Sequence, residues 1–518
     1  MNLTAGLRKA AAFSSDTTAL ISGDARLDRR TFVDRIARLA AVLRDLGMAT
    51  GDRVAMLAQN GQPYIEFYFA VLWGGGVIVP VNSRFALPEM IEQLRDASPV
   101  VLMVDAHFAD VGAELAASAP SVRAVLHAGP GEARGGAIAG EAAIAAARPA
   151  EDALRGGEDL ACIFYTGGTT GRSKGVMLSH RNLWANAAVT AARFGFDERT
   201  VALHAGPLFH LAAGARVFTT ALLGGTHVVI PRFTPVDALE AIARHRVTTV
   251  TFVPTMLAML LELPDLGAYD LSSLRLITYG ASPMPEAVLA ACLRRFPAVR
   301  FAQSYGMTEL SPVATILGPE DHAPDAPRQR LRSAGRPVWS AEVRVVDVDD
   351  RELPCGEIGE IVVRGPMVMQ GYWNQPELTA QTLRGGWMHT GDSGYFAPDG
   401  YLYVADRIKD MIISGGENVY SVEVENAVGS HPDVLQCAVI GVPDARWGER
   451  VHAVVVRRPG TTPTPEAILA HCRDVIAGYK CPRSVDIRDE PLPLSSVNKV
   501  NKAALRAPFW EGQARQVN

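Results

Sequence analysis

The chain has 518 residues, 48% of them hydrophobic and 20% charged, and a formal net charge of -5. This is the composition of an ordinary globular protein with ample apolar side chains for a large core, and at ~150 residues per domain the length predicts about three domain-sized units. A slightly acidic chain gives no reason to expect nucleic acid as a partner, so local Lys, Arg and backbone N–H groups would have to hold an anionic substrate.

The N-terminus shows no secretory signal. Arg8 and Lys9 precede only a short apolar stretch that ends before Ser14, so no h-region follows. No stretch approaches ~18 uninterrupted apolar residues, so no transmembrane segment is predicted. The cysteines are scattered without a C-x-x-C pair, which is typical of reduced thiols. We expect a cytoplasmic protein and leave a homodimer open.

The N-terminal part alternates helical and strand patterns. Apolar residues at helical spacing between Phe32 and Leu46 predict a helix. Short apolar stretches at 54–58 and 77–79 predict buried strands on either side of a helix at 64–73. Such alternation predicts an α/β fold with mainly parallel, helix-covered sheets.

The rest of the chain shows several different sequence patterns. Residues 111–159 are rich in Ala and Gly and predict surface helix and loop. Beyond Arg332 an alternating pattern predicts a β-rich subdomain, and from residue 407 onward the sequence predicts a small α+β unit with two helices. Between residues 159 and 332, further strands are predicted at 161–165, 226–230, 247–253, 274–278 and 299–303. The predicted domains are therefore 1–406 and 407–518.

A run of Gly and Thr residues follows the predicted strand at 161–165. It reads Tyr165-Thr166-Gly167-Gly168-Thr169-Thr170-Gly171-Arg172-Ser173-Lys174-Gly175. Glycines let backbone N–H groups turn toward an anion, the hydroxyls add donors, and Lys174 supplies a cation for a polyphosphate. The spacing is neither that of a Walker A loop nor that of G-x-G-x-x-G. The density of Gly, Thr and Lys favours a phosphate-binding loop over a solvated turn.

Together with four later motifs, this run resembles the signatures of the adenylate-forming superfamily, which comprises acyl-CoA synthetases, luciferases and peptide-synthetase adenylation domains. The closest similarity is to acyl-CoA ligases of the fatty acid and 4-coumarate type. The four later motifs lie at 304–309, 389–392, 401–425 and 492–499. Because five motifs occur in the family's order and span nearly the whole chain, the resemblance is specific.

The resemblance implies a two-step reaction. A carboxylate attacks the α-phosphate of ATP to form an acyl-adenylate and pyrophosphate, and a thiol then displaces AMP. Bringing two anions together requires positive charge and fixed donors rather than a general base. The expected cofactors are ATP, Mg2+ and coenzyme A as the thiol. The acid is predicted to be a medium- or long-chain fatty acid, with an arylpropenoic (coumarate- or ferulate-like) or other small acid as alternatives. A non-catalytic nucleotide-binding sensor is the alternative from another class.

The resemblance also assigns roles to individual residues. The predicted catalytic residues are Lys499, Glu309, Thr308 and His210. Lys499 would be the catalytic cation. Glu309 would be the ligand of Mg2+, because a single carboxylate together with phosphate oxygens suits this ion. His210 would lie beside the acyl and thiol tunnels. Each of these residues also has a purely structural interpretation: Lys499 as a solvated lysine, Glu309 as a surface or salt-bridged carboxylate, and His210 as a core histidine. Lys502 is a weaker candidate for the catalytic lysine.

The remaining assignments concern the substrates. The phosphate-binding residues are expected to be Thr166, Gly167, Gly168, Thr169, Thr170 and Lys174. Adenine would lie between Tyr305 and Gly280, Ala281 and Ser282, with Asp392 and Arg407 on the ribose and Gly415 and Gly416 on the pantetheine arm. The acyl group would contact His210, Ala213, Gly214, Gly280, Met307 and Val313. Lys409 maps to the hinge between the domains. Arg216 either meets a distal carboxylate of the substrate or lies on a solvated helix face, and the second interpretation is favoured.

Overall fold

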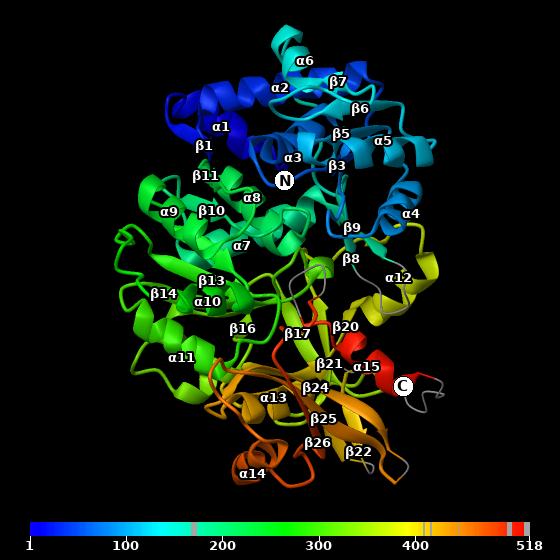
Figure 1. Ribbon diagram of the computed structural model, residues 1–518. Coiled ribbons are helices and arrows are strands. Elements are labelled where there is room, and N and C mark those ends of the chain that lie inside the picture. Colours follow the sequence, from blue (N-terminus) through cyan, green and yellow to red (C-terminus); the bar gives the residue numbers. More distant parts are fainter. Residues whose placement is uncertain (167–172, 408–409, 415–416, 445, 495–499, 512–518) are drawn as a thin grey trace.

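The computed structural model describes residues 1–166, 173–407, 410–414, 417–444, 446–494 and 500–511, with the side chain of Arg407 excepted. In Figure 1 the N-terminal sheets and their helices occupy the upper part of the molecule, and the C-terminal unit lies below them. Gly167, Gly168, Thr169, Thr170, Lys409, Gly415, Gly416 and Lys499 fall outside the described residues.

One large sheet has nine strands, of which the central ones are parallel. Their order is β16 (Arg336–Pro337), β15 (Thr315–Leu317), β14 (Arg300–Tyr305), β13 (Leu276–Gly280), β12 (Thr249–Phe252), β10 (Val201–His204), β11 (Thr226–Val229), β1 (Thr18–Ser22) and β2 (Ala25–Asp28). The associated helices are α7 (His180–Phe194), α8 (Leu211–Leu223), α9 (Pro235–His245), α10 (Pro254–Leu261) and α11 (Glu286–Arg295). Side chains alternate between the two faces of each strand, so Phe252 and Tyr279 enter the core shared with α9, α10 and α11.

The second sheet has eight strands and is also mainly parallel. Their order is β19 (Gly371–Tyr372), β9 (Lys174–Ser179), β8 (Leu160–Thr166), β4 (Val77–Pro80), β3 (Arg53–Leu57), β5 (Val101–Val104), β6 (Ala124–His127) and β7 (Ile138–Ala139). Its part of the chain also holds α1 (Ala5–Phe13), α2 (Arg29–Asp45), α3 (Gln62–Gly74), α4 (Leu87–Ala97), α5 (Ala109–Ser118) and α6 (Gly140–Ala146). The predicted strands at 54–58, 77–79 and 161–165 and the helix at 64–73 are confirmed.

The prediction of only helix and loop at 111–159 is wrong, because this segment contains β6 and β7. They extend the second sheet at one edge, where β6 pairs with β5. Within β6 only Leu126 and His127 are buried. An edge strand with so few buried side chains has a weak apolar pattern, which explains why the sequence did not reveal it.

The two remaining sheets form the β-rich subdomain and the C-terminal unit. The subdomain is an antiparallel sheet of β17 (Glu342–Val346), β18 (Gly359–Arg364), β20 (Met388–Phe396) and β21 (Leu402–Arg407), and α12 (Pro376–Thr382) lies in the same part of the chain. The C-terminal sheet contains β22 (Ile412–Ser414), β23 (Glu417–Val419), β24 (Val434–Asp444), β25 (Gly448–Arg457) and β26 (Ser484–Arg488). It is accompanied by α13 (Ser421–Gly429), α14 (Pro465–Val475) and α15 (Lys502–Trp510). The prediction of two helices in this unit is wrong, because the structure contains a third helix, α15. Only Leu505 of α15 is buried.

Candidate active site

The predicted phosphate loop connects two antiparallel strands. Thr166 is the last residue of β8, Lys174 is the first of β9, and the register pairs them directly. This pairing places the threonine and the lysine at one end of the hairpin. Both predicted phosphate ligands that the structure describes therefore lie at the base of the same loop.

Tyr372 links Lys174 to Glu309. The β19 strand pairs with β9, and the ammonium of Lys174 lies 5.3 Å from the centroid of the Tyr372 ring. The Tyr372 hydroxyl donates a hydrogen bond of 2.9 Å to Oε1 of Glu309. Glu309 is buried in the short 3-10 helix η2 (Thr308–Leu310), which begins at Thr308. A predicted phosphate cation and a predicted magnesium ligand are thus coupled through a tyrosine that sequence reasoning missed.

The predicted adenine and ribose residues are also in contact. Tyr305 ends β14, and its hydroxyl donates a hydrogen bond of 2.8 Å to Oδ2 of Asp392. Gly280 ends the neighbouring parallel strand β13 and pairs with Ser304. A Cβ at Gly280 would stand 2.3 Å from the Ser304 carbonyl oxygen, so glycine is required for this close approach. The carboxyl ends of parallel strands meet at one edge, which is where α/β sheets commonly bind ligands.

The segment after β13 carries backbone strain. Ala281 has φ +67°, a left-handed conformation that is uncommon for a residue with a side chain. Ser282 follows it directly. Such outliers cluster at ligand sites, where the surrounding structure holds them. The predicted adenine wall at 280–282 therefore lies beside Tyr305 in a conformation that the fold maintains.

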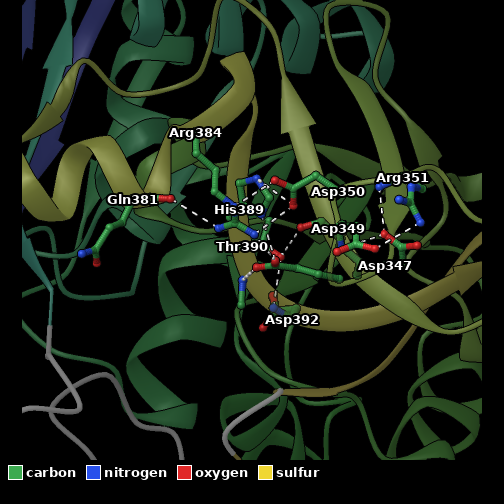
Figure 2. A network of polar contacts seen from close by, with 12 residues as sticks. Asp347, Asp349, Asp350, Arg351, Gln381, Arg384, His389, Thr390 and Asp392 are labelled. Carbon is green, nitrogen blue, oxygen red and sulfur yellow. Dashed lines mark hydrogen bonds and ion pairs between the residues drawn. The ribbon is translucent and has the colours of Figure 1, made fainter.

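The turn that carries Asp392 is fixed by hydrogen bonds from the β-rich subdomain. Glu360 accepts a hydrogen bond of 3.0 Å from the Gly391 amide and lies 2.9 Å from Nδ1 of His389. The amide of Asp392 donates to the Thr390 hydroxyl at 3.1 Å. Figure 2 shows His389, Thr390 and Asp392 within this network. The same carboxylate accepts the hydrogen bond from Tyr305 described above.

Three of the predicted acyl residues, His210, Ala213 and Gly214, lie at the start of α8. His210 is its N-cap residue, and its ring centroid lies 4.4 Å from that of Phe209. Ala213 follows in the first turn. A Cβ at Gly214 would stand 2.7 Å from the Tyr68 hydroxyl oxygen, so the bare face of this glycine is needed for packing against α3. Met307 and Val313 belong to a separate apolar cluster.

Arg216 does not lie on a solvated helix face, and the favoured interpretation of this residue is wrong. Its Nη1 atom is buried, and its Cζ lies 5.5 and 4.9 Å from the ring centroids of Phe194 and Phe196. The strands beneath α8 cover this face of the helix, a fact that the local sequence does not reveal.

Lys502 has a structural position. Its ammonium lies 2.7 Å from Oε1 of Glu425 and donates a hydrogen bond of 2.6 Å to the Ser421 hydroxyl. Burial opposes this charge, but Glu425 and Asp406 raise the pKa of Lys502 above its ordinary value. The weaker of the two candidate lysines is therefore already occupied by partners within the chain.

The described part of the chain contains no group of three or more His, Cys, Asp or Glu side chains arranged to hold a metal ion. None of its helices has both the length and the apolar character needed to cross a membrane.

The model of the AMP-binding enzyme family matches residues 7–373, and that of the AMP-binding enzyme C-terminal domain matches residues 423–499. The chain is 41% identical over 502 residues to a feruloyl-CoA synthase of Amycolatopsis sp, covering 96% of this chain and 97% of that protein. It is 36% identical over 512 residues to the medium/long-chain-fatty-acid–CoA ligase FadD8 of Mycobacterium tuberculosis, covering 96% and 88%.

A similar solved structure is that of the amide bond synthetase McbA from Marinactinospora thermotolerans. It has a TM-score of 0.87 and 34% identity, covering 98% of this chain and 100% of that one. The predicted α/β fold class and the predicted enzyme class, an AMP-forming acid–thiol ligase, are confirmed. The chain belongs to the AMP-binding enzyme family.

Proposed function

We propose that this protein is an ATP-dependent acid–CoA ligase that acts on an arylpropenoic acid. The observation that carries the reaction is the continuous set of contacts at the strand ends. Tyr372 couples Lys174 to Glu309, and the chain segment from Glu309 back to Tyr305 leads directly to the Tyr305–Asp392 hydrogen bond. These residues come from three sheets and the short helix η2, and together they offer a cation, a buried carboxylate, an aromatic ring and a ribose acceptor.

The choice of acid follows from the comparisons. The similarity to feruloyl-CoA synthase, at 41% identity, exceeds that to the fatty-acid ligase FadD8, at 36%. This favours the arylpropenoic alternative over the medium- or long-chain fatty acid that was our first prediction.

In the first half-reaction, a carboxylate oxygen of the acid attacks the α-phosphorus of ATP. A P–O bond forms, the bond from the α-phosphorus to the oxygen bridging to the β-phosphorus breaks, and pyrophosphate leaves with the electron pair. Thr166 and Lys174 hold the phosphates, Tyr305 stacks on adenine, and Asp392 accepts from the ribose hydroxyls. Their fixed positions supply orientation and charge stabilisation, which lower the barrier.

Glu309 fits the role of a magnesium ligand. It is a buried carboxylate whose Oε1 is oriented by Tyr372, and Mg2+ is held by one or two carboxylates together with phosphate oxygens and water. When bound, the ion neutralises charge on the phosphates. Tyr372 would keep the carboxylate oriented during the reaction.

In the second half-reaction, the sulfur of coenzyme A attacks the carbonyl carbon of the acyl-adenylate. A C–S bond forms, the C–O bond to AMP breaks, and AMP leaves. We infer that residues 407–518 form a mobile domain that turns about Lys409, and that Lys499 serves adenylation while Gly415 and Gly416 line the path of the thiol. His210, at the start of α8, would separate the acyl and thiol paths.

The proposal is tested with a panel of carboxylic acids. Coenzyme A-dependent AMP release should be highest with ferulate or 4-coumarate, and lower by tenfold or more in kcat/KM with octanoate and palmitate. Preference for the fatty acids would overturn the assignment of the acid. If no acid supports ATP–pyrophosphate exchange, the enzyme assignment itself fails in favour of a nucleotide-binding sensor.

A further inference from the structure

Arg216 is a partly buried cation, and all its contacts among the described residues are with neutral groups. Its Nη2 donates long hydrogen bonds of 3.4 Å to Oγ1 of Thr251 and of Thr278, and those two hydroxyls lie 2.7 Å apart. Its Nη1 is buried without a hydrogen-bond partner. Within the described residues it forms no ion pair with a carboxylate, and burial alone lowers its pKa to about 10.

The described strand residues that face Arg216 from beneath α8 include no carboxylate. Thr251 and Thr278 are paired residues of β12 and β13 and face α8, opposite the core face of Phe252 and Tyr279. On the same side of the sheet, His204 of β10 lies 3.0 Å from Nδ1 of His227 on β11. Burial, His227 and Arg216 lower the pKa of His204 well below its ordinary value. The described residues of this face are therefore hydroxyls and neutral imidazoles, and none of them offers Arg216 a negative charge.

Such an arrangement is costly unless a ligand completes it. A buried charge is normally paired, since removing it from water without compensation costs several kcal/mol. Stacking on Phe194 and Phe196 offsets part of that cost, because exposed cation–π contacts contribute roughly 0.5–1 kcal/mol and desolvated ones about 2. It does not satisfy the unpartnered Nη1 atom.

Arg216 lies at the acyl side of the active site. It follows Ala213 by one turn on α8 and His210 by six residues, a rise of roughly 9 Å at 1.5 Å per residue. That rise is comparable with the extended length of a phenylpropenoic acid. The Phe194 ring belongs to the apolar cluster that contains Val313, against which Met307 also packs. Arg216 thus lies between the two groups of predicted acyl residues, remote from the reacting end.

We propose that Arg216 determines acid specificity by donating from its guanidinium to an oxygen at the end of the acid remote from the reacting carboxylate. This inference rests on the proposed acid–CoA ligase function and narrows it to acids with a distal oxygen acceptor. The acceptor is a ring hydroxyl or a second carboxylate, both of which supply the lone pairs that Nη1 lacks.

The test compares acids that differ only at the distal end. We would measure kcat/KM for coenzyme A-dependent AMP release with cinnamate, 4-hydroxycinnamate and 4-carboxycinnamate, using the full-length wild-type chain and Arg216→Met. The wild type should prefer an oxygenated acid over cinnamate by tenfold or more, and Arg216→Met should bring that ratio close to one. The better of the two oxygenated acids identifies the acceptor as hydroxyl or carboxylate.

Two variants control for a structural effect. Arg216→Lys keeps the positive charge and should retain part of the preference. Arg29 is a second buried arginine, but it donates to the backbone carbonyls of Gly224 and Glu198, so Arg29→Met should leave the ratio unchanged. If Arg216→Met does not fold, the wild-type ratio and Arg216→Lys decide.

Three outcomes would contradict the proposal. They are a wild type that does not discriminate, an Arg216→Met variant that keeps the wild-type ratio, and a loss of the ratio in Arg29→Met as well. Calorimetric binding of 4-hydroxycinnamate to wild type and Arg216→Met provides a readout without turnover. If no acid is activated but Arg216→Met still binds 4-hydroxycinnamate more weakly than the wild type, the proposed ligase function is wrong and the proposed contact of Arg216 with the distal oxygen is supported.

Discussion

The region beneath α8 and the region around α15 each hold a partly buried cation, but among the described residues only the second pairs its cation with an acid. Lys502 lies against Glu425 and the Ser421 hydroxyl, and Ser421 in turn donates from its amide and hydroxyl to Asp406 at 2.6 Å each. Arg216 has two threonine hydroxyls and two aromatic rings. A cation that is paired with an acid stabilises the fold, whereas a cation without an acid is available to bind a ligand. Replacing Lys502 should therefore lower stability, and replacing Arg216 should change substrate specificity with little effect on stability.

The largest expected effect is that of Lys502→Met. It would leave Glu425 buried without its cation, which should lower the free energy of unfolding by about 3–5 kcal/mol. Urea denaturation of the variant would measure this loss. The double variant Lys502→Met with Glu425→Leu removes both charges and should regain a large part of the stability. A single variant as stable as the wild type would show that the pair contributes little.

The second effect concerns the histidines beneath α8 and appears at acid pH. Burial lowers the pKa of His227 to about 3, so between that value and about 6.5 the unfolded chain binds more protons than the folded chain. Stability therefore falls as the pH falls through this window, by about 2–3 kcal/mol at pH 4.5 for a single such group. His227→Leu should show a correspondingly shallower loss between pH 7 and pH 4.5 in denaturant titrations. Equal slopes for the two proteins would exclude His227 as the cause.

The motifs and the long-range contacts differ in how far sequence predicts them. The run from Thr166 to Lys174 and the Tyr305 motif are continuous in sequence, so their chemistry could be predicted locally. Tyr372 could not, because its role depends on β19 pairing with β9, which is distant in the chain. Arg216 was interpreted as solvated for the same reason. Helical spacing predicts which residues lie on the same face of a helix as Arg216, but it does not predict which strands cover that face.

Tyr372 also allows a smaller test of the active-site region. Tyr372→Phe removes the hydroxyl that donates to Glu309 and keeps the ring beside Lys174. A hydrogen bond to a charged group contributes about 1.5–3 kcal/mol, so we expect a fall of about tenfold or more in kcat/KM for ATP. The fall should be reduced at high Mg2+ concentration if Glu309 is the ligand. A magnesium-independent defect would instead point to the contact with Lys174.

The smallest expected change is that of Arg216→Met on stability, and it is the sharpest test of the comparison. Removing a buried charge that has no acid leaves no orphaned carboxylate behind, and methionine fills a similar apolar volume against Phe194 and Phe196. The free energy of unfolding should therefore stay within about 1 kcal/mol of the wild type or rise. Urea denaturation beside Lys502→Met would measure the contrast directly. A loss for Arg216→Met as large as that for Lys502→Met would mean that both cations stabilise the fold, and that the absence of an acid near Arg216 has no bearing on ligand binding.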